Sequence, residues 1–464
     1  MPTNISELAA SQHGATGGVS SLGRASWVAF EWGRNPYFLL VGIYIYGPYF
    51  QNQIVGDPVL GQALWADIWA YAGLTVAVSA PFLGAIADAG GPRKPWLVFF
   101  SALLALASCL LWFGQPGGVG LSLFAVGALI AIANFGYDAS IVFHGAMLPS
   151  IAKEGGIGRL SGLGYALGNL AGLLLLVFVL VFIFLPENPL FGLDREAHEH
   201  ERVVGPLAAI WFLIFCIPFF LWTPDRPPST RPLSDVVREG LSSVAHTVGS
   251  LKRYRNVGVY LLARMIYNDG LNMMLTFGGI YASGAFGWDV IEVALYGIVL
   301  SPFAALGGFA GGILADRIGT KTALRISLTG SILFGILSLG FAPDRVLFFL
   351  PYAEGMEALP LPLFATLPEL LYIGAVACIA VCVVATYSNS RAMMARIAPH
   401  KRMTEFFGLY ALSGEATAFA APLAVAIATR VSGSQQWGMA AILVFLSVGL
   451  AGLSFVREER ADAA

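Results

Sequence analysis

The stretch Gly84-Ala85-Ile86-Ala87-Asp88-Ala89-Gly90-Gly91-Pro92-Arg93-Lys94 lies between two long apolar runs, residues 65–86 and 96–113. A near copy follows much later, again between apolar runs: Gly312-Ile313-Leu314-Ala315-Asp316-Arg317-Ile318-Gly319-Thr320-Lys321. Asp88 and Asp316 are 228 residues apart, as are Gly91 and Gly319, and this is close to half of the 464-residue chain. The sequence therefore predicts two related halves, an arrangement that is common among membrane transporters.

Each residue type in this loop has a physical role. The first glycine, four residues before the aspartate, lets two membrane helices approach closely. The aspartate ends a helix, where its carboxylate can accept hydrogen bonds from a neighbouring helix N-terminus or from an arginine. The second glycine allows a tight turn, and the basic residues hold the loop on the cytoplasmic side. We expect two conformational-switch loops, formed by Gly84, Asp88, Gly91, Arg93 and Lys94 and by Gly312, Asp316, Arg317, Gly319 and Lys321. The alternative is a pair of ordinary basic turns.

The composition is that of an integral membrane protein. Apolar residues make up 57% of the chain and charged residues 12%, with a mean hydropathy of +0.73. Soluble domains carry roughly 25% charged residues. The net charge of −2 gives no indication of nucleic-acid binding. The four cysteines all fall in apolar runs, so we expect packing residues rather than a disulfide or metal pair.

Twelve apolar runs are long enough to span a bilayer, which takes about 20 residues. They lie near 26–50, 63–87, 96–114, 120–148, 160–185, 206–223, 258–284, 291–315, 322–342, 368–390, 403–429 and 437–456. The repeated loop resembles the signature loop of the major facilitator superfamily. That resemblance and the twelve runs predict an all-α membrane protein of two pseudo-repeated six-helix bundles. The expected parts are a disordered tail (1–23), a first bundle (24–223), a linker (224–257), a second bundle (258–456) and a short tail (457–464).

Charge places these parts relative to the membrane. Twenty of the 26 Lys and Arg fall in segments that would be cytoplasmic if both termini were inside, so the positive-inside rule predicts that orientation. The linker contains apolar residues at helical spacing from Val237 to Leu251, which predict an amphipathic helix on the membrane surface. In the acidic outer loop 186–206, His198 and His200 flank Glu199, but no further ligand cluster accompanies them, so we expect no metal there.

Charged residues inside the predicted spans are functional candidates, because a charge at the bilayer centre costs roughly 2.5–3.5 kcal/mol. Glu31 and Arg34 in the first span are three residues apart and either pair structurally or line a pathway. Asp138 lies in the fourth span, where His144 is interpreted as an interfacial residue. The candidate substrate or proton pathway comprises Glu31, Arg34, Asn35, Asp138, Arg264, Asn268, Asp269, Asn272 and Glu415.

Asp269 is the sharpest of these candidates. Gly270 loosens the helix beside it, and Asn268 and Asn272 offer hydrogen bonds on one face of the seventh span. The alternative is a satisfied polar contact between helices. In the fifth span, Gly164, Gly168 and Gly172 predict a seam of close helix packing. A Gly-Pro arrangement typical of antiporters is lacking there, so the sequence does not support counter-transport.

Several further motifs resemble the branch of the superfamily that is named for the autophagy-related vacuolar amino-acid effluxer. They are residues 80–88 (APFLGAIAD), 161–168 (SGLGYALG), 267–270 (YNDG), 388–399 (SNSRAMMARIAP) and 405–414 (EFFGLYALSG). The first span differs, with Phe30-Glu31-Trp32-Gly33-Arg34-Asn35 where the family usually has Tyr-Asp-Trp-Ala-Asn-Ser. The resemblance implies export of amino acids or similar small solutes.

The main hypothesis is a secondary transporter of a small solute that works by alternating access, with proton coupling suggested by the acidic residues. The alternatives are an exporter of amphipathic drugs or lipids, or a sensor on the same fold. An enzyme is not expected, because no H-E-x-x-H motif is present and no catalytic partner is assigned to His144, the one histidine near a span. No P-loop indicates ATP drive. We expect no cofactor and no nucleic acid; the partners would be substrate, protons and lipid. We also expect a monomer in a bacterial inner membrane.

Overall fold

The computed structural model describes residues 19–89, 91–152, 157–225, 227, 234–235, 238, 242, 254–399, 406, 409–410, 413–414 and 416–458. Most of both predicted tails lies outside these residues, as do most of the predicted amphipathic helix at 237–251 and Glu415.

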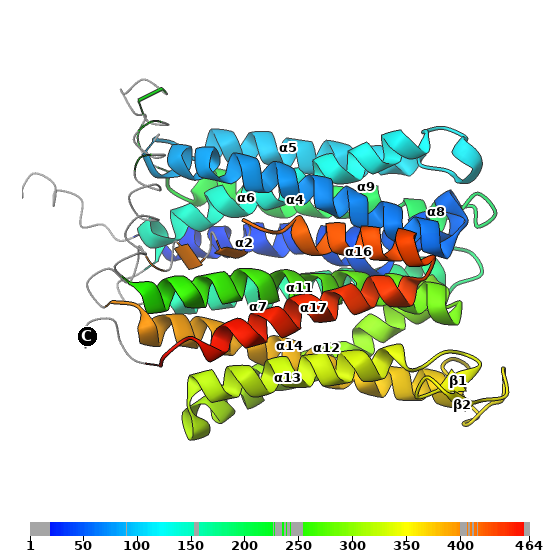
Figure 1. The fold of residues 1–464 in the computed structure, drawn as a ribbon. Helices are drawn as coiled ribbons and strands as arrows, with labels where there is room; N and C mark the ends of the chain where they lie inside the picture. The colour runs from blue at the N-terminus through cyan, green and yellow to red at the C-terminus, as the bar shows by residue number, and fades with distance from the viewer. Residues whose placement is uncertain are drawn as a thin grey trace, which may run out of the picture.

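The first half is a bundle of long helices that run along one common direction (Figure 1). Its main elements are α2 (Ser21–Tyr37), η1 (Phe38–Tyr44), α3 (Tyr46–Tyr49), η2 (Phe50–Val55), α4 (Pro58–Ala89), α5 (Lys94–Leu110), α6 (Leu123–Ile151), α7 (Ile157–Val179), η5 (Leu180–Phe184), α8 (Glu199–Arg202) and α9 (Val204–Trp222). Short 3₁₀ turns occur at η3 (Leu111–Phe113), η4 (Pro116–Gly118) and η6 (Leu190–Gly192).

The second half repeats this layout. Its helices are α11 (Arg255–Phe286), α12 (Val290–Ile318), α13 (Thr320–Leu339), α14 (Leu367–Ile397), α16 (Ala420–Ser432) and α17 (Gln435–Ser454). The long loop between α13 and α14 contains a small hairpin of β1 (Arg345–Val346) and β2 (Leu350–Pro351), with Arg345 opposite Pro351. This hairpin lies at the end of the molecule opposite the C-terminus (Figure 1).

The helices correspond to the predicted spans. Within the described residues, eight helices are long and apolar enough to cross a membrane. α4 and α11, at 32 residues each, coincide with the second and seventh predicted spans. The first span is divided into shorter segments, and the predicted eleventh span is described mainly from residue 416 onward, including α16.

The first span is not one continuous α-helix. η1 and η2 are π-helices, and the short α3 separates them. Pro36 in α2 and Pro48 in α3 supply no backbone N–H, which weakens regular α-helical bonding around them. π-helical turns are frequent at functional sites. This span therefore changes helical geometry just beyond the candidate residues Glu31, Arg34 and Asn35.

The glycines of α7 form the predicted seam against this first span. A Cβ at Gly168 would lie 3.1 Å from the carbonyl oxygen of Glu31, and one at Gly172 would lie 2.8 Å from the Leu39 side chain. Gly164 faces Trp27 and Glu31. The prediction of a close-packing seam is confirmed, and the seam fixes the distance between α7 and the candidate residues.

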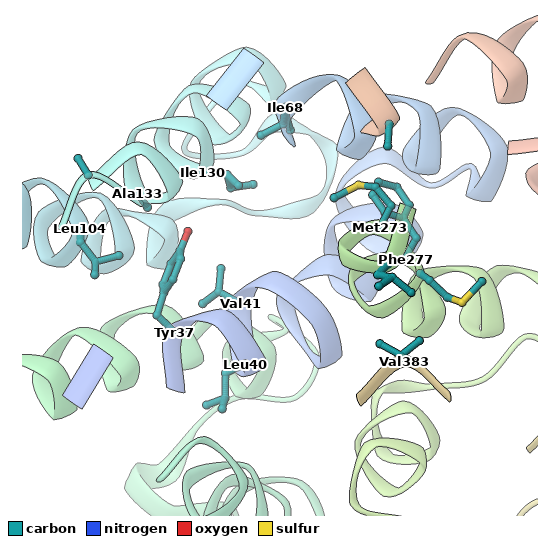
Figure 2. Close-up of a cluster of buried hydrophobic side chains, with 14 of the residues drawn as sticks. Tyr37, Leu40, Val41, Ile68, Leu104, Ile130, Ala133, Met273, Phe277 and Val383 are labelled. Carbon is teal, nitrogen blue, oxygen red and sulfur yellow. The ribbon is translucent and has the colours of Figure 1, made fainter. Parts of the chain in front are cut away.

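One large apolar core joins both halves. Figure 2 shows Tyr37, Leu40 and Val41 of the first span near Leu104, Ile130 and Ala133 of the first half. The same cluster continues through Met273, Phe277 and Val383 of the second half. Between the halves, α4 packs beside α16 (Figure 1). η1 and α3 also pack against α11.

Neutral amides close the interface between the halves at the end opposite the chain termini. Gln435 of α17 donates from Nε2 to the Gln51 Oε1 at 3.2 Å and to the Pro58 carbonyl at 2.8 Å. Gln62 of α4 donates from Nε2 to the Thr429 Oγ1 at 3.0 Å and to the Gln435 carbonyl at 3.1 Å. We call Gln51, Gln62, Thr429 and Gln435 the amide closure; each is at most 7% exposed.

Further contacts surround the amide closure. Asn52 donates to Ser283 Oγ at 2.6 Å across the two halves. Asp67 of α4 and Arg430 of α16 form a bidentate ion pair at the more exposed rim. Together these contacts make the structure closed on the side opposite the termini.

The contact of α12 with α14 gives a stability prediction. A Cβ at Gly307 would lie 2.8 Å from the Cα of Val381, so Gly307→Ala must push two backbones apart. We expect a loss of about 1–3 kcal/mol, the usual range for overpacking, measured as a lower thermal midpoint in detergent. At the neighbouring Gly308, a Cβ would make only an ordinary 3.5 Å contact with Val384, so Gly308→Ala serves as the control. Equal midpoints for the two variants would contradict the packing argument.

The amide closure gives a conformational prediction. Gln435→Ala removes the hydrogen bonds to Gln51 and Pro58, so it should favour a state that is open on that side. Spin labels at the exposed Leu60 and Val431, with the four native cysteines replaced, should then show an added population at longer distance by electron paramagnetic resonance.

The matched control is Gln436→Ala. Gln436 donates its Nε2 to the Leu339 carbonyl within the second half, so its loss should leave the distance distribution unchanged. If Gln435→Ala also left the distribution unchanged, the amide closure would not hold the two halves together.

Candidate functional site

Arg34 lies at the centre of a buried polar cluster in the first half. Its Nη2 donates to Oε2 of Glu31 at 2.6 Å, and its Nη1 donates to Oγ of Ser140 at 3.1 Å. The guanidinium carbon lies 5.1 Å from the ring centre of Tyr137, within the range of a cation–π contact. Arg34 is 3% exposed, so the ion pair with Glu31 offsets the cost of burying its charge. The pairing of Glu31 with Arg34 that the sequence suggested is therefore present.

His144 joins the same cluster from α6. Its Nδ1 lies 3.1 Å from Oε1 of Glu31, and its Nε2 lies 3.0 Å from the carbonyl oxygen of Trp27. The ring stacks between Trp27 and Phe30, with centroid distances of 4.3 and 4.7 Å. The interpretation of His144 as an interfacial residue is wrong, because its side chain is fully buried and bonded to the first span.

The sequence contained a signal for this arrangement. Tyr137, Ser140 and His144 are spaced three and four residues apart, which places them on one face of α6 toward α2. Asp138 is half-buried and lies within electrostatic reach of Tyr37 and Tyr137. Asp138 stands out in the sequence because it is charged, whereas Tyr137 and Ser140 beside it are neutral and do not.

Arg264 occupies a corresponding place in the second half. Its Nη1 donates to the Tyr410 carbonyl at 2.7 Å and to the Ser413 Oγ at 2.6 Å, and its guanidinium carbon lies 3.6 Å from the centre of the Tyr410 ring. Asn268, one turn further on, donates to the Gly414 carbonyl at 3.4 Å. The structure thus brings two of the predicted α11 residues against the eleventh span.

The two arginines belong to a repeated pattern. Arg34 and Tyr37 recur as Arg264 and Tyr267, both pairs being 230 residues apart. Tyr37 donates its hydroxyl to Oδ1 of Asn134 at 2.9 Å, and the Tyr267 hydroxyl lies 2.7 Å from the Ser390 Oγ. In each half, the arginine and tyrosine therefore lie on the first long helix, and the tyrosine bonds to the fourth.

The other α11 candidates lie close by. Asp269 is 2% exposed and lies within electrostatic reach of Tyr387. Asn272 is half-buried, and its Oδ1 accepts a hydrogen bond from the Tyr387 hydroxyl. Asn35 of the first span is buried and packs against Gly168. Of the predicted pathway residues, Glu415 falls outside the part of the chain that the structure describes.

Several buried polar atoms near these residues have no hydrogen-bond partner within the described chain. They include the Nε atoms of Arg34 and of Arg264. The same holds for one amide atom each of Asn35 and Asn134 and for both amide atoms of Asn389. An unpaired buried donor or acceptor costs about 1–3 kcal/mol, so these atoms are suited to a polar ligand or water.

The two predicted switch loops are held by carboxylates that are not among the residues predicted for them. In the first, the Asp225 carboxylate accepts from the backbone N–H groups of Arg93 and Lys94 at 2.8–3.0 Å. In the second, Glu458 accepts from the N–H groups of Thr320 and Lys321 at 3.0 and 3.2 Å. Both acceptors follow the last helix of their half, so the halves share this capping arrangement as well.

The remaining loop residues have simpler surroundings. Gly84 and Asp88 lie in the last turns of α4, and Gly91 and Gly319 adopt the positive φ expected for a tight turn. Gly312, Asp316 and Arg317 lie in the last turns of α12, where Asp316 and Arg317 are exposed. Lys94 also donates from Nζ to the Phe220 carbonyl at 2.8 Å. Arg93 donates from Nη1 to the Ala146 carbonyl at 2.5 Å.

The loop 186–206 contains the two histidines that the sequence places around Glu199. His198 and His200 both contact Glu201, at 3.3 and 3.1 Å. Among the described residues, no group of three or more His, Cys, Asp or Glu side chains could hold a metal ion.

Solved structures of membrane transporters share this helical architecture. The D-xylose–proton symporter matches with a TM-score of 0.65 at 12% identity, covering 94% of this chain and 97% of the other. A POT-family transporter in complex with 5-aminolevulinic acid matches with a TM-score of 0.62 at 14% identity, covering 96% and 98%. The predicted fold of the major facilitator superfamily, with twelve helices in two bundles, is confirmed.

The chain belongs to the family described as vacuole effluxer Atg22 like, whose model matches residues 70–157 and 157–464. An uncharacterised MFS-type transporter of Bacillus subtilis, YxiO, is 24% identical over 446 residues and covers 94% of both chains. Autophagy-related protein 22 of Cryptococcus neoformans is 23% identical over 308 residues, which is 65% of this chain and 51% of that protein. YxiO is described as an MFS-type transporter and the structural neighbours are transporters, so the chain is a multi-pass membrane transporter of a small molecule and not an enzyme.

Proposed function

We propose that this transporter carries a small zwitterion, an amino acid or a related metabolite, by alternating access. The observation that carries the proposal is the pair of buried arginines, Arg34 and Arg264, each with an unpaired Nε–H in the part of the chain described. Arginine presents a planar fork of donors that matches a carboxylate. A substrate carboxylate would therefore satisfy a donor that the protein leaves open.

Asp269 supplies the complementary charge. It lies five residues along α11 from Arg264 and is almost completely buried. A carboxylate inside the membrane attracts a cation, and a substrate amine is such a cation. A site with a guanidinium and a carboxylate on one helix favours a solute that carries both charges.

The alternating-access part rests on the amide closure and the repeated halves. A transporter with two pseudo-symmetric bundles exposes a central site to one side of the membrane at a time. In this structure the amide closure shuts one of the two sides. The name of the family supports export, and the acidic residues support proton coupling. We further propose a monomer in a bacterial inner membrane, with both termini in the cytoplasm and the two bundles bounded as the sequence predicts.

Arg264→Lys tests the carboxylate site. Lysine keeps the charge but loses the fork of donors and the stacking on Tyr410, so we expect uptake of labelled amino acids into liposomes to fall about 10–100-fold, as for a charged hydrogen bond of about 1.5–3 kcal/mol. The exposed Arg325 offers a matched control, Arg325→Lys, which should transport like wild type. If neither the wild type nor the control variant transports any amino acid of the panel, the proposed substrate class is wrong.

Asp269→Asn tests the amine site. We expect it to abolish uptake of amino acids both with and without a proton gradient, because the neutral amide no longer compensates the substrate amine. Uptake of a carboxylate solute without an amine should be affected less. Equal losses for both solutes would assign Asp269 to helix packing instead.

A further inference from the structure

We propose that Glu31 and His144 share one dissociable proton and that this pair is the site where proton binding couples to substrate binding. The shared proton follows from contacts in the first half alone. The coupling rests on the proposed function, because it requires a carboxylate substrate at Arg34.

Both ring nitrogens of His144 face oxygen atoms. Nδ1 lies 3.1 Å from Oε1 of Glu31, and Nε2 lies 3.0 Å from the carbonyl oxygen of Trp27. A carbonyl oxygen only accepts, so Nε2 must carry the hydrogen of that bond. A neutral imidazole has one N–H, and the Trp27 contact uses it.

The contact between His144 and Glu31 therefore needs a second hydrogen. Without it, a lone pair of Nδ1 would face a carboxylate oxygen at hydrogen-bond distance in a buried site. One added proton, on Nδ1 or on Oε1, turns this repulsion into a charge-assisted hydrogen bond. The observed geometry is thus that of the protonated pair.

The surroundings of the pair hold it in place and limit where the proton can go. Trp27 bonds to His144 twice, since its indole Nε1 also donates to the His144 carbonyl at 3.1 Å. His144 is fully buried, whereas the Glu31 side chain is 19% exposed. Glu31 is therefore the member of the pair through which a proton from water can enter or leave.

The charged and titratable neighbours come from several helices. α2 supplies Arg34, which holds the other carboxylate oxygen of Glu31. α6 supplies Tyr137, which interacts electrostatically with Glu31 and Arg34. Asp138 of α6 and Tyr165 of α7 in turn interact electrostatically with Tyr137. α9 presents Phe219 to the imidazole, with Lys94 of α5 lying 6.0 Å from the centre of that ring.

The proton changes the charge that a substrate meets. Arg34, Glu31 and His144 together carry one net positive charge when the shared proton is bound and none when it is absent. The protonated cluster attracts a substrate carboxylate more strongly, and by linkage the bound carboxylate strengthens proton binding equally. Loss of the proton also places repulsion between α2 and α6, which favours a shift of these helices.

The shared proton can be tested without any substrate. The full chain is labelled with ¹⁵N-histidine, placed in lipid nanodiscs and followed by NMR between about pH 5 and 9, with His144→Gln assigning the ring signals. We expect one step in which the Nδ1 signal and the infrared carboxyl band of Glu31 change together. Glu31→Gln should remove this step, because the glutamine amide can donate to Nδ1 without an added proton.

A neutral His144 ring beside an ionised Glu31 throughout this range would overturn the proposal. His198→Gln, in the outer loop, is the control and should leave the step in place. Since the central measurement uses the wild-type protein, misfolding of a variant cannot produce the negative result.

Transport then tests the coupling. In liposomes, Glu31→Gln and His144→Gln should lose accumulation driven by a proton gradient by a much larger factor than exchange of labelled for unlabelled amino acid. Two results would overturn the coupling. In one, both variants fold but lose accumulation and exchange alike; in the other, both variants accumulate substrate as the wild type does. If wild-type protein transports no amino acid, the proposed substrate fails, and the NMR step still decides whether the proton site exists.

Discussion

Ionisable groups inside a bilayer need partners within the protein, and this constraint organises the interior of the transporter. Arg34 is held by Glu31, Ser140 and Tyr137, and Arg264 by Tyr410 and Ser413. Each arginine ties the first helix of its half to one other helix of the same half. Between the halves, the side-chain hydrogen bonds of the described residues gather at the amide closure and its rim, while apolar packing joins the halves elsewhere.

The two halves share a frame but differ in chemistry. Both halves contain the Arg-x-x-Tyr pattern, and in both the tyrosine hydrogen-bonds to the fourth helix. Both also have a carboxylate that caps the N-terminus of the third helix. The first half adds the buried Glu31–His144 pair, and the second adds Asp269 with its asparagines. The two halves thus share a scaffold and differ in the charged groups that it holds.

Much of the fold could be predicted from the sequence. The two copies of the G-x-x-x-D loop and the apolar runs gave the twelve-helix arrangement, and Gly164, Gly168 and Gly172 gave the seam of α7. The breaks in the first span could not be predicted to the residue, because π-helical turns depend on packing against α11 and α7 as well as on Pro36 and Pro48.

The candidate site was predictable only in part. Charged residues in apolar runs stand out, so Glu31, Arg34, Arg264 and Asp269 were found. His144 did not stand out, because its role depends on Trp27 and Glu31 more than 110 residues away. The amide closure was missed for the same reason, since Gln51, Gln62 and Gln435 acquire meaning only when distant helices meet.

The chemistry of the amide closure has a consequence for how the transporter responds to its surroundings. Amide hydrogen bonds neither titrate nor depend strongly on ionic strength, whereas the exposed Asp67–Arg430 pair at the rim is screened by salt. The hydrogen bonds of the amide closure are therefore insensitive to pH on the side that they close. A change of salinity weakens the ion pair at the rim without breaking these hydrogen bonds.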